Sequence, residues 1–263
     1  MQTLTREDTR QLLNKVPEVT LTFWIIKIMA TTVGETAADF LNFNLHFGLT
    51  GTSALMAALL AAFLFTQMRA RQYMPWLYWV VVVLISIVGT LITDNLVDNF
   101  GVPLQTTTLV FGLALLATFA VWFASEKTLS IHTIFTRKRE GFYWLAILFT
   151  FALGTAAGDL AAEGLSLGYA NSTLLFGALI GLVTLAHYGF KANAVLAFWL
   201  AYILTRPLGA SLGDYLSQPA GNGGLGLGSM GTSLLFLASI LSLVSYLSVS
   251  RKDVQALPAR DIR

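Results

Sequence analysis

The sequence predicts an all-α polytopic membrane protein with eight transmembrane helices, formed by four parallel two-helix repeats that are pseudo-symmetric about the membrane normal. The 263-residue chain is 56% hydrophobic and only 11% charged, a composition that soluble proteins do not have. A Trp, a Gly and an Asp also recur four times, with the Gly ten and the Asp fifteen residues after the Trp. These sets are Trp24, Gly34 and Asp39; Trp79, Gly89 and Asp94; Trp144, Gly154 and Asp159; and Trp199, Gly209 and Asp214.

Eight segments are apolar and close to the length of about 20 residues that a helix needs to span a bilayer. In chain order they are 18–43, 48–68, 74–98, 106–125, 142–165, 172–190, 194–217 and 230–249. Each repeat takes two segments, so all four repeats have the same orientation in the membrane. The distances from one repeat Trp to the next are 55, 65 and 55 residues, which indicates a four-span half that was itself duplicated.

Lys and Arg residues precede the first segment and follow each even-numbered segment, whereas the loops after the odd-numbered segments contain none. The positive-inside rule therefore predicts that both termini are cytosolic. The expected organisation is an N-terminal segment at 1–17, a first half at 18–126, a basic linker at 127–141, a second half at 142–249 and a tail at 250–263. We interpret the two halves as one bundle. The Gly-rich stretch at 218–231 is expected to be an external loop, either mobile or re-entrant.

The repeated Trp, Gly and Asp, in four tandem units of two spans each, resemble a family of bacterial integral membrane proteins defined by a four-fold repeat of unknown function. The similarity covers essentially the whole chain. It implies eight spans in the bacterial inner membrane and one Trp per repeat, and it implies no activity. We expect lipid and a small cation as partners and no nucleic acid, with the oligomeric state open and a homodimer as one possibility.

Half of the fourteen acidic residues fall inside the predicted spans: Glu35, Asp39, Asp94, Asp98, Asp159, Glu163 and Asp214. A charged side chain at the bilayer centre costs about 2.5–3.5 kcal/mol, so we expect these residues to face the interior of the bundle. Three pairs of them are four residues apart and therefore share a helix face. Crowded carboxylates repel one another unless they share protons or a cation. The alternative is that the repeat Asp residues only cap helices or join neighbouring repeats.

Hydroxyl residues in similar repeat positions extend the predicted set of oxygen ligands: Thr36, Ser53, Thr90, Thr108, Thr155, Thr173 and Ser233. An all-oxygen set suits a hard divalent ion such as Mn²⁺, and the chain has no cysteine for a thiolate site. Such an ion would be a substrate, and no covalent cofactor is expected. His46, His132 and His187 lie near span ends or in loops, where a ligand role is not expected.

Two basic residues, Lys27 and Arg206, also fall inside predicted spans. They could neutralise an empty acidic site and compete with the cation. Alternatively, each pairs with a single acid, or Lys27 extends to the cytosolic interface. Pro207 either breaks the seventh span or only kinks it. The repeat Trp residues are expected to mark the membrane interface, with an aromatic box for an organic cation as the alternative.

These features favour a secondary transporter, an exporter or exchanger of a hard divalent cation coupled to protons. The alternatives are a transporter of an organic cation or small metabolite with a Trp-lined site, a passive cation channel, and a structural or sensory membrane protein. No enzyme is expected. Gly158-Asp159 and Gly213-Asp214 resemble part of the Gly-x-Gly-Asp signature of intramembrane aspartyl proteases, but Ala156 and Ser211 replace its first Gly.

Overall fold

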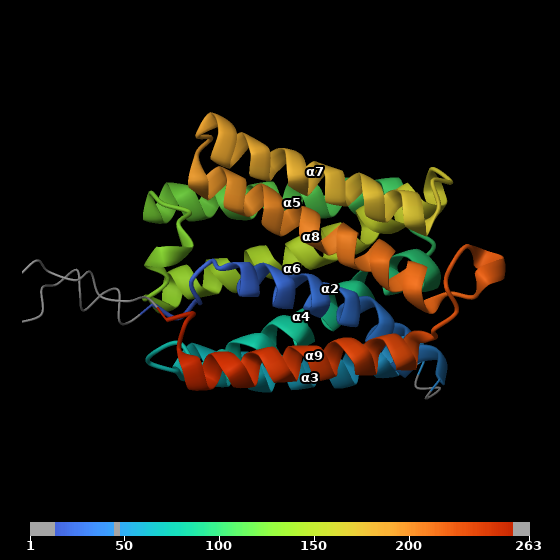
Figure 1. Cartoon of the computed structure of the whole chain (residues 1–263), viewed down its shortest axis with the longest axis horizontal. Coiled ribbons are helices and arrows are strands. Elements are labelled where there is room, and N and C mark those ends of the chain that lie inside the picture. Colours follow the sequence, from blue (N-terminus) through green and yellow to red (C-terminus); the bar gives the residue numbers. More distant parts are fainter. Residues whose placement is uncertain (1–13, 45–47, 255–263) are drawn as a thin grey trace, which may run out of the picture.

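The computed structural model describes residues 14–44 and 48–254, and these residues form eight long helices and no strand. The helices run side by side along the longest axis of the molecule (Figure 1). They are α2 (Leu21–Asp39), α3 (Gly48–Arg69), α4 (Pro75–Asp94), α5 (Leu104–Glu126), α6 (Arg137–Asp159), α7 (Tyr169–Phe190), α8 (Ala194–Ser217) and α9 (Ser229–Ser250). The predicted all-α fold with eight helices is confirmed.

Seven of these helices are long and apolar enough to cross a membrane, and α2 differs because it carries Lys27, Glu35 and Asp39. The predicted segments match the helices closely, except that α6 begins at Arg137 instead of residue 142. The reason is a helix cap: the Thr136 side chain accepts a hydrogen bond from the backbone N–H of Arg139, 3.2 Å away. The last residues of the predicted linker at 127–141 are therefore helical.

The first helices of the four repeats form a closed ring, in which α2 packs against α4, α4 against α6, α6 against α8, and α8 against α2. The repeat Gly lies at each of these contacts, where a Cβ atom would collide with the next helix. In every case the collision is with the residue that follows the next repeat's Trp by seven positions. The pairs are Gly34 with Ser86, Gly89 with Phe151, Gly154 with Arg206, and Gly209 with Thr31. Small residues let membrane helices approach closely, which explains the repeated Gly.

The second helix of each repeat lies outside the ring and packs on the inner helix of the following repeat. Thus α3 packs on α4, α5 on α6, α7 on α8, and α9 returns to pack on α2. In Figure 1, α9 lies at one edge of the molecule, and it contacts α4 as well as α2, although these helices are far apart from it in sequence. The outer helices expose large apolar side chains on their surfaces, as expected for helices that face lipid, among them Leu109, Leu116, Leu174, Leu182 and Leu241. Because the last repeat closes onto the first, both halves belong to one bundle.

The repeat Trp residues do not form an interface belt, so that prediction is wrong for three of them. Trp79, Trp144 and Trp199 are 1–4% exposed and pack against neighbouring aromatic rings inside the bundle. The Trp199 Nε1–H donates to the carbonyl of Leu129 at 2.9 Å. In the same aromatic layer, the hydroxyls of Tyr78 and Tyr143 lie 2.6 Å apart. The ring is therefore filled with aromatic side chains at its Trp end.

Two features of the last repeat settle alternatives that the sequence left open. Pro207 does not break α8, which continues as one helix from Ala194 to Ser217. After α8, the Gly-rich stretch makes a short 3-10 turn at Ala220–Asn222 and folds back on the helix end, with the N–H of Leu225 bonded to the carbonyl of Tyr215. It contains no helix that re-enters the membrane.

Candidate cation site

The Asp end of the ring has an irregular backbone. In three repeats the inner helix stops at the repeat Asp and continues as a five-residue π-helical turn: Phe40–Asn44, Asn95–Asn99 and Leu160–Gly164. The fourth inner helix, α8, ends at Ser217 without such a turn. Single π-helical turns are often found at functional sites, because they displace side chains from the regular helical positions.

A cavity of about 150 Å³ lies between the helices at this end. All seven predicted acids line it, together with Asn42, Val97, Leu104 and Gln218. Asn42 was not predicted as a site residue, although it lies three residues after Asp39 and so on the same helix face. The expectation that the acids of all four repeats face the interior and converge is therefore met by the geometry.

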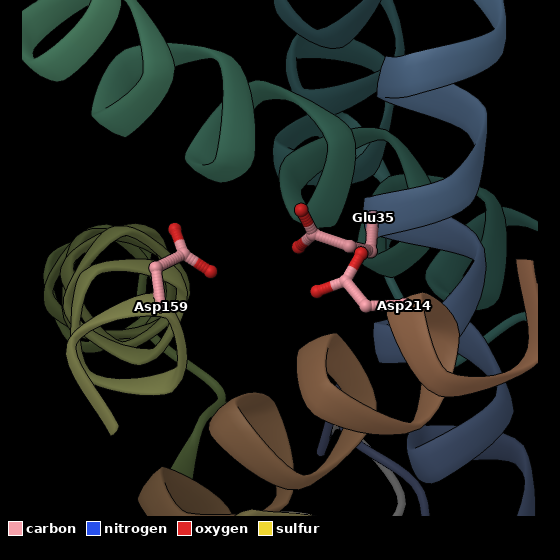
Figure 2. A group of neighbouring side chains, drawn as sticks. All are labelled: Glu35, Asp159 and Asp214. Atoms are coloured by element: carbon pink, nitrogen blue, oxygen red, sulfur yellow. The ribbon is translucent and has the colours of Figure 1, made fainter. Parts of the chain in front are cut away.

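The acids are arranged by depth. Asp98 and Glu163 are exposed at the mouth of the cavity, whereas Glu35 and Asp214 are buried at its inner end. One oxygen each from Glu35, Asp159 and Asp214 lies within 4.8 Å of the other two. Figure 2 shows Glu35 and Asp214 side by side, with Asp159 pointing toward them from the opposite side. Three acids from three repeats thus meet at one point.

Arg206 is fully buried and binds Glu35, one of the residues that line this cavity. Its Nη2 is 2.9 Å from Glu35 Oε2 and donates to the Thr155 hydroxyl at 2.7 Å and to the Thr90 hydroxyl. Its Nη1 donates to the carbonyl of Thr31 at 3.3 Å. Glu35, Thr90 and Thr155 each follow their repeat Trp by eleven residues. A single guanidinium group therefore binds the same position in all three other repeats.

Lys27 lies elsewhere, and it neither pairs with an acid nor reaches the interface. It is fully buried, and its ammonium nitrogen is 4.0 Å from the ring centre of Phe151 and 4.1 Å from that of Tyr202. Within the part of the chain that the structure describes, this nitrogen has no hydrogen-bond partner. The predicted pairing with one acid is wrong, because cation–π contacts hold the side chain instead.

The predicted hydroxyl ligands do not line the cavity, so this part of the predicted site is wrong. Thr36 bonds Ser233 at 2.7 Å, and Ser53 accepts a hydrogen bond from the Asn95 amide. Their hydrogen bonds join neighbouring helices. The others also lie outside the cavity lining: Thr90 and Thr155 bind Arg206, Thr173 bonds the carbonyl of Tyr169, and the Oγ1 atom of Thr108 is buried.

The histidines lie outside the acidic cavity as well. His132 and His187 line a separate cavity of about 540 Å³ between α2, α7, α8 and the segment before α6, where Trp24 also lies. His187 Nδ1 is 3.0 Å from the carbonyl oxygen of Ala192. His46 falls outside the described residues.

Fold and cavity together define a multi-pass membrane protein in which four pseudo-equivalent helices surround an acidic cavity. The chain matches the sequence profile of the Repeat of Unknown Function (DUF347) four times, at residues 22–73, 77–128, 142–193 and 197–253. These matches cover most of the chain, and the protein belongs to this family. No curated protein and no solved structure matches the chain.

Proposed function

We propose that the protein is a secondary transporter of a hard divalent cation such as Mn²⁺, coupled to protons, and that the acidic cavity is its binding site. The observation that carries the proposal is the convergence of seven carboxyl groups from all four repeats on one cavity inside the bundle. Carboxylates crowded in this way repel one another until protons or a cation neutralise them. A site that binds either protons or a metal cation can exchange one for the other. The charge pattern and the family resemblance favour the bacterial inner membrane, with cytosolic termini.

The dimensions of the cavity support a small, hard ion. About 150 Å³ is the volume of roughly five water molecules at about 30 Å³ each. Pockets for drug-sized organic ligands are larger, about 300–1,000 Å³. Carboxylate oxygens bind Ca²⁺ at about 2.3–2.6 Å and smaller divalent ions at closer range, so oxygens on opposite sides of one ion lie about 4–5 Å apart. The mutual spacing of Glu35, Asp159 and Asp214, within 4.8 Å, fits this requirement.

Three observations weigh against the alternatives. The buried Trp side chains are packed against other rings and do not line the acidic cavity, which disfavours a Trp-lined site for an organic cation. Arg206 and the aromatic layer fill the ring beneath the cavity, which disfavours an open channel. Among the described residues, no side-chain hydrogen bond joins a repeat Asp to another helix, which disfavours a purely structural role.

The first test is the melting temperature of the purified full-length protein with Mn²⁺, Mg²⁺, Ca²⁺ and tetramethylammonium. At a concentration 100-fold above its dissociation constant, a bound ion stabilises the folded state by about 2.7 kcal/mol. We expect a saturable increase with Mn²⁺ that is lost in Asp94→Asn and Asp159→Asn. The control is Glu126→Gln, because Glu126 lies outside the cavity and pairs with Lys138 and Arg139.

The second part of the test measures Mn²⁺ transport in liposomes. Liposomes that contain the protein should take up Mn²⁺ with a simultaneous change in internal pH, and the two Asn variants should remove both signals. The proposal fails if no divalent ion changes the melting temperature. It also fails if both Asn variants melt lower than the wild type but transport at the same rate, since the acids would then have a structural role.

A further inference from the structure

Arg206 binds Glu35, a buried acid of the cavity lining, and only one of the four repeats has a basic residue at this position. At the same position the other repeats have Thr31, Ser86 and Phe151. A Cβ atom on Gly154 would lie 2.5 Å from Arg206 Cβ, so the missing side chain of Gly154 provides the space through which the Arg206 stem passes. The ring therefore accommodates one large cationic side chain at its centre.

The contacts of Arg206 hold it in place from all sides. Its guanidinium group is bonded to Glu35 from the first repeat, Thr90 from the second and Thr155 from the third. Glu35 also lines the cavity and belongs to the closest group of three acids. Arg206 therefore occupies one oxygen of the very carboxylate that an incoming ion would use. The next basic group below it is Lys27, followed by the aromatic layer.

We propose that Arg206 is the gating and selectivity residue of this site. Its guanidinium group holds Glu35 until a divalent cation binds Glu35 in its place and releases Arg206. This inference rests on the proposed function of the acidic cavity. It adds the coupling step, because the ion that binds Glu35 is also the ion that releases Arg206 from its contacts with the other three repeats.

The charge of Arg206 makes this gate selective. Coulomb energies scale with the product of the charges, so at equal distance a divalent ion interacts with Glu35 twice as strongly as a monovalent ion or a guanidinium group does. A divalent ion can therefore replace Arg206, whereas K⁺ or Na⁺ offers no more charge than the group it must displace. The guanidinium group is always protonated, so it remains a competitor at every physiological pH.

The test uses Arg206→Gln in the full-length protein, with Mn²⁺ and K⁺ as probes. Removing the tethered competitor should tighten Mn²⁺ binding about tenfold, and K⁺ should enter liposomes that exclude it when they contain the wild type. Arg206→Lys keeps the charge but loses the planar set of guanidinium donors. Its Mn²⁺ affinity and its K⁺ entry should therefore lie between those of the wild type and those of Arg206→Gln. A folded Arg206→Gln variant with wild-type Mn²⁺ affinity and no K⁺ entry would overturn the gate.

A double variant tests the gate while keeping the positive charge of Arg206. The double variant Thr90→Val and Thr155→Val removes two hydrogen bonds to Arg206 with little change in volume, and it should tighten Mn²⁺ binding in the same direction as Arg206→Gln. The matched control is Thr93→Val. Thr93 is buried on the same helix as Thr90 but bonds the carbonyls of Gly89 and Ala152 instead of Arg206.

The outcomes separate the two proposals. If the double valine variant binds Mn²⁺ like Thr93→Val, the gate is refuted while the cavity remains a cation site. If neither the wild type nor Thr93→Val binds any divalent ion, the cation site and the gate are both refuted.

Discussion

Replacement of Gly209 by Ala tests whether the first and fourth repeats close the ring. A Cβ atom on Gly209 would lie 2.5 Å from Thr31 Cβ and 2.9 Å from the backbone nitrogen of Thr32. Ordinary van der Waals contact begins at 3.4 Å, so α2 and α8 would have to separate by about 0.9 Å. The Thr32 backbone cannot rotate away, because it belongs to α2 itself.

The size of the effect follows from this collision. Overpacking of a dense core costs about 1–3 kcal/mol. For a chain of about 150–250 residues, each kcal/mol changes the melting temperature by about 2–4 °C. We therefore expect Gly209→Ala to melt about 2–12 °C below the wild type. The gain in helix propensity from Gly to Ala, about 0.5–1 kcal/mol, offsets part of this loss.

The assay is thermal unfolding of the purified protein in one detergent, with Gly181→Ala as the matched control. Gly181 is also helical, but it is exposed on α7 and a Cβ atom there would meet nothing within 4 Å. This control should melt at or slightly above the wild-type temperature, because Ala restricts the unfolded chain. If Gly209→Ala melts as high as Gly181→Ala, the close contact between α2 and α8 is refuted.

Two further predictions concern the opposite end of the bundle. Lys15→Met should destabilise the protein by about 3–5 kcal/mol, because it leaves Glu140 buried without the ammonium group that lies 2.6 Å away. The double variant, Lys15→Met with Glu140→Met, removes both charges and should therefore recover most of the melting temperature that the single variant loses. Burial raises the pKa of Asp253, whose carboxyl group accepts a hydrogen bond from Tyr73. The folded state thus binds this proton more tightly than the unfolded state, so the resulting stability is present below the ordinary pKa of 3.8 and is lost as the pH rises through the raised value. Asp253→Asn should remove this pH dependence from the melting temperature, and an unchanged pH profile would contradict the assignment.

The helices and repeats of this protein could be predicted because they depend on local features. Hydropathy over about 20 residues located the eight helices within a few residues. The start of α6 was missed because a side-chain cap at Thr136 begins the helix before the apolar run does. The π-helical turns after Asp39, Asp94 and Asp159 were also missed, since no composition or spacing signal marks them.

The candidate site was predictable in part, for an energetic reason. Charged groups inside a membrane must avoid lipid, so seven acids within spans were expected to share one interior space, and all seven line the same cavity. Hydroxyl groups face no such constraint, because a Ser or Thr side chain can bond the carbonyl of its own helix. Thr173 does so with Tyr169, and the sequence could not separate this possibility from a ligand role.

The sequence by itself determined the number of helices, the four-fold repeat and the placement of the seven acids on one interior cavity, since each follows from local hydropathy and spacing. Only the tertiary structure decided which helix faces meet. Contacts between residues more than fifty positions apart decide three features of the structure. These are the cyclic order of α2, α4, α6 and α8, the burial of Trp79, and the ion pair between Arg206 and Glu35. Such contacts arise from close packing in three dimensions, where a single missing Cβ atom, as at Gly154, decides which side chain fits.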